Sequence, residues 1–284
     1  MHSRTTLMGE TDFTAADAFD GLAATYDAIE AGNPTLQWMR QRVQKAALST
    51  FAPGGRLLEV GCGTGTDVLF FVKNGYRVFG IDPSQEMLMA AREKISAAGF
   101  AQKVELLQGG ANEVDELFAQ NYAGLFDGIF SNFGALNCVA DLRQFARCAT
   151  RLLNHGGKIL LCFMPPVCPW EMAYYLLRLR GREAFRRWRG RSGRRGIAAR
   201  VGDRWVQTYY HSRAALTEVF SSAFTIEKQF SLGLLVPPPY LLHAVARYPK
   251  LFNGLVRCEK SLAVWPIFRN VGDHVVVIFQ KRMI

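Results

Sequence analysis

The stretch LEVGCGTG at residues 58–65 is the feature that most constrains the fold of this chain. It follows an apolar run that begins at Arg56, and it precedes a segment with helical spacing, residues 66–75. Glycines at such a turn adopt backbone angles that other residues avoid, and they let a ligand approach the main chain closely. A glycine-rich turn between a strand and a helix is typical of α/β proteins that bind nucleotide-like ligands.

An acid follows this turn at the end of the next apolar run, residues 76–82. A carboxylate about twenty residues after the glycines can accept hydrogen bonds from two ribose hydroxyls, and Asp82 holds that position. The glycines are spaced GxGxG rather than the GxGxxG of dinucleotide sites, and Glu59 lies two residues before the first. Glu59 is badly placed for a pyrophosphate and well placed for an ammonium group. These features predict S-adenosylmethionine (SAM) and disfavour an NAD-dependent oxidoreductase.

Apolar runs alternate with amphipathic segments along the chain, which predicts an α/β protein with a parallel sheet covered by helices on both faces. Ligand sites in such sheets lie at the carboxyl ends of the strands. Strands are expected at residues 56–61, 76–82, 103–109, 126–132, 158–164, 224–232 and 274–282. Helices are expected at 18–30, 36–51, 66–75, 84–99 and 141–157, the last with a Gly-Gly stop. We expect residues 1–15 to be a loose leader.

Several motifs resemble, in order and spacing, those of class I SAM-dependent methyltransferases. EVGCGTG (59–65) resembles their first motif, and LAATYD (22–27) resembles the N-terminal segment of small-molecule methyltransferases of the ubiquinone/menaquinone type. LLEVGCGTGTDVLFF, FGIDPSQEML, FDGIFSNFGALN and LLNHGGKILLCF follow in the expected order. The resemblance covers roughly residues 18–164 and continues more weakly to the end. It implies a Rossmann-like, seven-stranded, mostly parallel sheet with an antiparallel last strand.

The same resemblance implies a set of cofactor-binding residues. They are Tyr26, Glu59, Gly61, Gly63, Gly65, Asp82, Pro83, Met87, Ala111, Asn112, Ser131 and Asn132. Within this set, Glu59 corresponds to the residue that holds the methionine part, Asp82 to the ribose ligand and Met87 to the residue against the adenine. Tyr26 is expected to close over the methionine end.

The chain departs from the family pattern after the third strand. The family often has Gly-Asp-Ala there, and its acid holds the adenine amino group, whereas this chain has Gly109-Gly110-Ala111-Asn112. Gly110 cannot supply that contact. Either Asn112 or the backbone replaces it, or adenine is bound more weakly.

No side chain stands out as a general base. His211 and Glu171 are the candidates, whereas His155 is expected in a solvated turn and His274 as a satisfied residue at an edge of the last strand. Methyl transfer needs little more than in-line approach of a lone pair. A base matters for hydroxyl or carbon acceptors and much less for a thiolate or a carboxylate. The lack of an obvious base therefore does not argue against catalysis.

Two irregular stretches, about 165–210 and 232–272, are expected to join N-terminal helices 15–51 as a substrate cap on a single domain, residues 1–284. Aromatic side chains in these stretches predict either a pocket for an apolar, ring-bearing substrate or an ordinary cap core. They are Trp170, Tyr174, Tyr175, Trp188, Trp205, Tyr209, Tyr240, Phe252 and Trp265.

Arginines give Arg178–Arg204 the strongest charge in a chain whose net charge is +10. The stretch is interpreted as a solvated surface or as a site for an acidic carrier protein, a membrane surface, a phosphate-bearing substrate or nucleic acid. SNFG (131–134) is not the NPPY-type motif of many nucleic-acid methyltransferases, and PPPY (237–240) follows the sixth strand. The six cysteines form no CxxC pair and no metal site is expected. Without an apolar run of about 18 residues, we expect a cytoplasmic protein that can associate peripherally with a membrane.

The sequence therefore predicts a SAM-dependent methyltransferase acting on a hydrophobic or aromatic small molecule. Lipid-like, quinone-like and polyketide-like acceptors remain open, and the acceptor can be carrier-bound. One alternative is a nucleic-acid methyltransferase steered by the arginine-rich stretch. Another is a SAM-binding sensor or partner subunit without transfer activity. The acceptor atom and the oligomeric state are left open.

Overall fold

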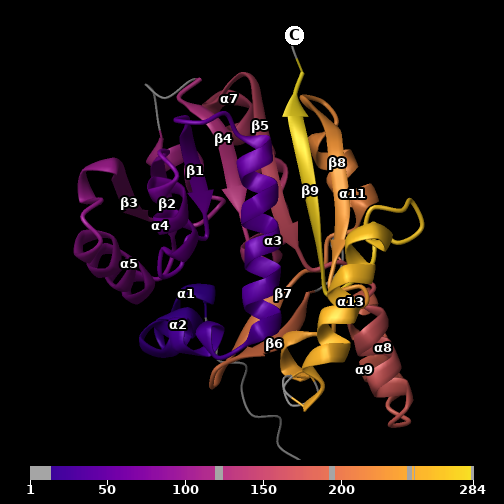
Figure 1. Ribbon diagram of the computed structural model, residues 1–284. Coiled ribbons are helices and arrows are strands. Elements are labelled where there is room, and N and C mark those ends of the chain that lie inside the picture. Colours follow the sequence, from indigo (N-terminus) through magenta and orange to yellow (C-terminus); the bar gives the residue numbers. More distant parts are fainter. Residues whose placement is uncertain (1–13, 119–123, 192–195, 242–244, 246, 283–284) are drawn as a thin grey trace, which may run out of the picture.

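A seven-stranded sheet forms the centre of the protein in the computed structural model, which describes residues 14–118, 124–191, 196–241, 245 and 247–282 (Figure 1). Its order is β3-β2-β1-β4-β5-β9-β8. The strands are β1 (Arg56–Val60), β2 (Arg77–Asp82), β3 (Val104–Gln108), β4 (Phe126–Ser131), β5 (Leu153–Phe163), β8 (Phe224–Leu232) and β9 (His274–Lys281). The strands β1 to β5 pair in parallel, and β9 is antiparallel to both neighbours. The predicted Rossmann-like sheet with an antiparallel last strand is confirmed.

Helices cover the two faces of this sheet, because alternate strand residues face opposite sides. Leu57 and Phe130 belong to one core, and Leu58 and Ile129 belong to the other. The first core packs against α3 (Pro34–Thr50), α4 (Thr66–Lys73) and α5 (Gln85–Ala97). The second packs against α6 (Val114–Leu117), α7 (Arg143–Leu152) and α11 (Arg213–Phe220). Both sets of helices were predicted apart from α6 and α11.

Two expected helices have different bounds in the structure. Residues 18–30 form α1 (Ala15–Asp20) and α2 (Ala23–Ala31), separated at Gly21, and Thr14 begins α1 with a capping box. The helix expected at 141–157 ends at Leu152, and β5 starts at the next residue. The Gly-Gly pair therefore lies inside β5, where Gly156 has a φ of +73° beside an irregular register with β4. The leader expected at residues 1–15 lies outside the described residues up to residue 13.

The irregular stretches carry short elements beside the main sheet. They are α8 (Pro169–Leu176), α9 (Gly181–Ala184), α10 (Arg186–Arg189), β6 (Ile197–Val201), β7 (Arg204–Thr208), η3 (Pro239–Leu241) and α13 (Pro249–Leu262). The antiparallel β6–β7 hairpin was not predicted, and it contacts α1 and the single turn η2 (Ala135–Cys138). A further turn, η1 (Ala101–Lys103), precedes β3. Among the described residues, no helix combines the length and the apolar character needed to cross a bilayer.

Candidate active site

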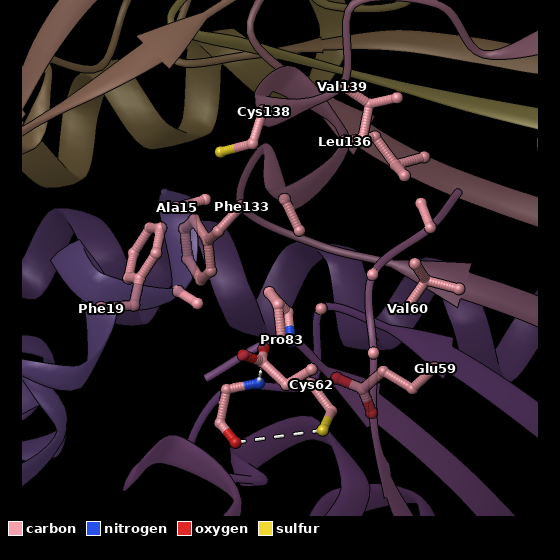
Figure 2. Close-up of a pocket in the computed structure, with 18 of the residues that line it drawn as sticks. Ala15, Phe19, Glu59, Val60, Cys62, Pro83, Phe133, Leu136, Cys138 and Val139 are labelled. Atoms are coloured by element: carbon pink, nitrogen blue, oxygen red, sulfur yellow. Dashed lines mark hydrogen bonds between the residues drawn. The ribbon is translucent and has the colours of Figure 1, made fainter. Parts of the chain in front are cut away.

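A cavity of about 830 Å³ lies at the carboxyl ends of β1, β2, β3 and β4. Its wall is formed by the glycine turn, by the segments after β2, β3 and β4, and by residues of α1 and α2. In Figure 2, Leu136 and Val139 lie toward one end of the cavity, and Glu59 lies toward the other. The cavity therefore joins a polar floor at the strand ends to an apolar wall.

The glycine turn allows the main chain to line this cavity. A Cβ on Gly61, which has a φ of +73°, would come within 2.3 Å of the Cβ of Ala135. Gly63 has a φ of +52° and faces open space, since nothing lies within 4 Å of the place a Cβ would take. A side chain at Gly61 would push away the loop after β4, and one at Gly63 would occupy the cavity.

Asp82 lies at the end of β2 with its carboxylate fixed from two sides. Its Oδ2 accepts a hydrogen bond from the Gly63 N–H at 2.8 Å, and its Oδ1 accepts one from the Ser84 N–H at 2.9 Å. Burial raises the pKa of Asp82, although these two backbone donors act in the opposite direction. Each carboxylate oxygen keeps a further lone pair, which is what two ribose hydroxyls require.

Glu59 contributes a buried carboxylate to this cavity. Its side chain is buried, and Oε2 has no hydrogen-bond partner in the described structure. Burial and the nearby Asp67 raise the pKa of Glu59 well above its ordinary value. A cationic ligand that donates a hydrogen bond would satisfy this oxygen and favour the ionised carboxylate.

A buried ion-pair cluster supports the floor beside Glu59. Arg40 of α3 lines the cavity and pairs with Glu30 and Asp67. Asp67 also accepts a hydrogen bond from Asn132 Nδ2 at 2.9 Å, and Asn132 Oδ1 accepts one from the Phe133 N–H at 2.8 Å. The cluster therefore fixes the loop after β4 to the helix that follows the glycine turn.

The N-terminal helices cover the glycine turn. Asp20 accepts a hydrogen bond from Ser84 Oγ at 2.5 Å, and Asp27 accepts one from Thr64 Oγ1 at 2.6 Å. These contacts bring Phe19 and Tyr26 to the cavity wall. Burial raises the pKa of the Tyr26 hydroxyl, which therefore stays neutral.

Most of the predicted cofactor residues meet at this cavity. Those that line it are Tyr26, Glu59, Gly61, Gly63, Asp82, Pro83, Ala111, Asn112 and Asn132.

Gly65, Met87 and Ser131 do not line it. A Cβ on Gly65 would come within 2.9 Å of the Ala91 Cβ, which indicates a packing role. Met87 is buried behind the wall, and Ser131 Oγ donates to the Val60 carbonyl at 2.8 Å, which ties β4 to β1.

The two catalytic candidates also lie outside the cavity wall. His211 is buried, and its Nε2 lies 3.2 Å from the carbonyl oxygen of Leu136, so that nitrogen is engaged. Burial lowers the pKa of His211. Glu171 is buried in ion pairs with Arg186 at 2.5 Å and Arg187 at 2.9 Å.

The cap aromatics and the arginine-rich stretch differ from their expected settings. None of the nine cap aromatics, for which a pocket or a cap core was left open, lines this cavity, and Trp188, Trp205, Tyr240 and Trp265 are exposed. Arg187 is buried, so the stretch is not a uniformly solvated surface. Residues 192–195 lie outside the described structure.

Sequence reasoning missed Glu113, which lines the cavity after β3. Its Oε2 accepts a hydrogen bond from the Gly110 N–H at 2.6 Å. Position 110, where the resemblance leads one to expect an acid, is a glycine, and the carboxylate of Glu113 lies beside it. The signal was present in GGANE, because a turn after a strand can bring residues three apart together.

Comparison with known proteins identifies the domain. Residues 57–157 match the family described as "Methyltransferase domain". The demethylmenaquinone methyltransferase of Symbiobacterium thermophilum is 30% identical over 148 residues, which are 51% of this chain and 56% of that relative. The chain thus spans about half the length of the curated relatives that it matches.

Solved structures share the fold at low identity. Geranyl diphosphate C-methyltransferase from Streptomyces coelicolor, solved with S-adenosyl-L-homocysteine, is 14% identical with a TM-score of 0.52, over 86% of this chain and 75% of that chain. The cyclase SpnF is 14% identical with a TM-score of 0.59, over 94% of each chain. These likenesses concern the fold alone. Residues 57–157 thus form a methyltransferase domain by their match to that family, and the chain as a whole is similar in fold to SAM-dependent methyltransferases.

Proposed function

We propose that this chain transfers the methyl group of SAM to a hydrophobic or aromatic small molecule. The observation that carries the proposal is the pair of carboxyl groups on one cavity. Asp82 is oriented by two backbone donors, and Glu59 has a buried oxygen that finds no partner among the described residues. A ribose and an ammonium group, joined in one ligand, would satisfy both.

The charge of the site supports a cationic ligand. Three buried acids and one buried arginine line the cavity, and Arg40 is already paired with Glu30 and Asp67. SAM carries an ammonium and a sulfonium group. The carboxylates of the cavity outnumber its arginine, so they attract both positive charges. Transfer of the methyl group removes the sulfonium charge, so the demethylated product, S-adenosyl-L-homocysteine (SAH), is attracted less strongly.

In our proposal, each polar group of SAM is held by a different residue of this chain. Glu59 holds the ammonium group and Asp82 holds the two ribose hydroxyls. Glu113 accepts from the adenine amino group in place of the acid missing at Gly110. The apolar wall around Phe133 excludes water from the methyl group, and approach in line with the breaking bond supplies most of the rate.

The nature of the wall and the relatives together support the acceptor class. Phe19, Phe133, Leu136 and Val139 give the cavity an apolar side. A matching relative is named for demethylmenaquinone, a ring-bearing lipid. We therefore infer a quinone-like or other lipid-like ring as the acceptor, and the aromatic cap residues do not enter this argument.

The experiment measures binding and transfer separately. Titration calorimetry of the purified protein with SAM and SAH tests the cofactor site. Incubation with methyl-tritiated SAM and reduced demethylmenaquinone, followed by solvent extraction, then tests transfer. Label in the extracted quinone supports the proposal. Label in added transfer RNA instead would favour the nucleic-acid alternative, and binding without transfer to any acceptor would favour the silent sensor.

A second part of the proposal concerns the surface through which the protein reaches a lipid-like acceptor. Leu177 and Leu179, after α8, are 84% and 95% exposed, and exposed arginines such as Arg178 and Arg182 lie beside them. Figure 1 shows α8 and α9 projecting from one end of the molecule. Exposed leucines flanked by arginines match the interfacial region of an anionic bilayer. We infer that this tip docks on anionic lipid, from which a lipid-like acceptor is taken.

Flotation with vesicles tests the docking. Vesicles containing phosphatidylglycerol should carry the protein, and pure phosphatidylcholine vesicles should carry much less. The double variant Leu177→Asp/Leu179→Asp should stay at the bottom of the gradient while still binding SAH. Docking on lipid would be contradicted if the variant floated as well as the wild type. It would also be contradicted if the wild type bound an acyl-carrier protein but no vesicles.

A further inference from the structure

A second, smaller cavity of about 240 Å³ shares two walls with the cofactor cavity. Tyr26 and Phe133 line both. The smaller cavity is otherwise lined mainly by apolar side chains, including Ile29 and Met164, with His274 as its titratable group besides Tyr26 and the paired Glu30. A ring held here would lie against the same two aromatic residues that border the cofactor cavity.

His274 is the first residue of β9, so it lies at the start of the last strand as the sequence suggested. Within the sheet, β9 lies between β5 and β8. The His274 side chain is 9% exposed, and its Nδ1 lies 3.1 Å from Oδ2 of Asp273. Among the described residues, no hydrogen bond engages Nε2.

Asp273 is held as an ionised acceptor for this histidine. Its Oδ1 accepts from Arg187 Nη2 at 2.8 Å, and its backbone oxygen accepts from Arg187 Nη1 at 2.8 Å. Burial opposes ionisation, but His274 and Arg187 outweigh it and hold the pKa of Asp273 below its ordinary value. In the neutral imidazole, an ionised carboxylate at Nδ1 holds the proton on that nitrogen, which leaves the lone pair on Nε2.

Glu171 completes the arrangement from the far side. It accepts from Arg187 Nε at 2.9 Å and also pairs with Arg186. The chain of contacts therefore runs from Glu171 through Arg187 and Asp273 to His274. Glu171, which the sequence suggested as a base, is a positioning residue at the buried end of this chain.

Phe133 stands between the two cavities in a strained conformation. Its φ is +47°, an angle that residues with a side chain rarely adopt. Its ring centroid lies 5.9 Å from that of His274 and 4.7 Å from the guanidinium carbon of Arg40. Strain of this kind persists where the surroundings require one side-chain placement, and it is concentrated at functional sites.

We propose that the smaller cavity is the acceptor subsite and that His274 is the general base for a hydroxyl-bearing ring. This rests on the methyl transfer proposed above. His274 Nε2 takes the hydroxyl proton while the acceptor oxygen bonds to the methyl carbon. The carbon–sulfur bond breaks, and its electron pair stays on sulfur. Asp273 stabilises the imidazolium that forms, and the proton then passes to water.

The charged groups around the cavity are compatible with this role. Glu30 is neutralised by Arg40, and Tyr26 stays protonated because burial raises its pKa. Arg187 is engaged by Asp273 and Glu171 rather than by the histidine. Asp273 is therefore the group that acts directly on His274, and a neutral acceptor meets the histidine as its proton acceptor.

The test uses 4-nitrophenol, a small hydroxyl-bearing ring whose anion is yellow. The probe is added to SAH-saturated protein in slightly acid solution, where free 4-nitrophenol is mostly neutral. We expect the bound probe to absorb as the anion in the wild type and as the neutral phenol in His274→Asn. The asparagine amide keeps a donor for Asp273 but removes Nε2. Failure of the probe to bind, or the same absorption in both proteins, would overturn the inference.

A paired rate measurement separates a base from a structural role. With SAM in the same slightly acid solution, His274→Asn should slow transfer to 4-nitrophenol by about a hundredfold or more. Transfer to 4-nitrothiophenol, which is already a thiolate, should change little. Equal losses on both acceptors would show that His274 only holds the fold. Calorimetry with SAH distinguishes the two proposals, because SAH binding without the anion signal overturns only this inference, whereas no SAH binding overturns the proposed function.

Discussion

The backbone N–H of Gly63 donates to Asp82 Oδ2 at 2.8 Å, so the glycine turn and the acid at the end of β2 form one unit. The main-chain angle at Gly63 and the position of the carboxylate depend on each other. The turn thus shapes the cavity and also orients the ribose ligand. Loss of either residue should therefore affect cofactor binding more than stability.

Asp82→Ala should weaken SAH binding by about ten- to a hundredfold, the value of hydrogen bonds to a charged group. Titration calorimetry measures the change in Kd. Asp203→Ala is the matched control. The Asp203 side chain is fully exposed, and the residue is far from Asp82 in the sequence. Unchanged SAH affinity in Asp82→Ala would contradict the assignment of this residue to the ribose.

Glu59→Gln should stabilise the ligand-free protein while it weakens SAM binding. Burial raises the pKa of Glu59 in the folded state, so ionisation costs stability as pH rises above the unfolded value of 4.5. The amide carries no charge, and Tm at neutral pH should rise by about 2 °C or more. The difference from the wild type should shrink in acid, where both side chains are neutral. Scanning calorimetry across pH measures it, and a lower Tm for Glu59→Gln would contradict this account.

The sheet and the polar floor could be predicted from the sequence because their signals are local. The glycine turn, Glu59 and Asp82 lie within 24 residues, and apolar runs mark each strand directly. Register in a parallel sheet then brings the strand ends to one side. The antiparallel last strand was reached only through the family resemblance.

Contacts between distant segments could not be predicted in this way. The ion pairs behind His274 join Arg187 to Glu171, 16 residues away, and to Asp273, 86 residues away. Each of these residues taken alone is a plausible surface charge. Burial and pairing become visible only when α8, α10 and β9 are placed together, and the short cap elements carry too little periodicity for that.

Glu113→Ala should reduce discrimination between adenine and hypoxanthine. The carboxylate of Glu113 accepts from the Gly110 N–H and has lone pairs left for the adenine amino group. S-inosylhomocysteine has a carbonyl in place of that amino group. The wild type should prefer SAH over this analogue by about tenfold, and the variant should bind the two nearly equally. Preserved preference in the variant would place the recognition at Asn112 or the backbone instead.

Cys138 should report occupancy of the cofactor cavity. It lines the cavity, and burial raises its pKa to about 11, so it holds about a hundredfold less thiolate than an unperturbed thiol. Labelling by N-ethylmaleimide should therefore be slow, and SAH should slow it further. The exposed Cys258 is an internal control whose labelling SAH should leave unchanged. Peptide mass spectrometry follows both sites, and equal protection of the two would indicate a global rather than a local effect.

Asp273→Asn should affect stability and acceptor choice together. The variant leaves buried Arg187 with one carboxylate partner, Glu171, and should lose about 3 kcal/mol of unfolding free energy near neutral pH. The folded pKa of Asp273 is depressed, so its contribution is present above the unfolded value of 3.8 and is lost as pH falls through the folded value. Urea unfolding should therefore show the difference from the wild type shrinking in strong acid.

The same variant should slow transfer to 4-nitrophenol more than transfer to 4-nitrothiophenol, because the asparagine no longer fixes the proton on Nδ1 of His274. Asp203→Asn, at a fully exposed side chain, controls for the loss of one carboxylate. An equal effect of Asp273→Asn on both acceptors would assign Asp273 to the fold alone. A selective loss on the oxygen acceptor would instead show that the carboxylate acts through the histidine, because only that acceptor has a proton to give.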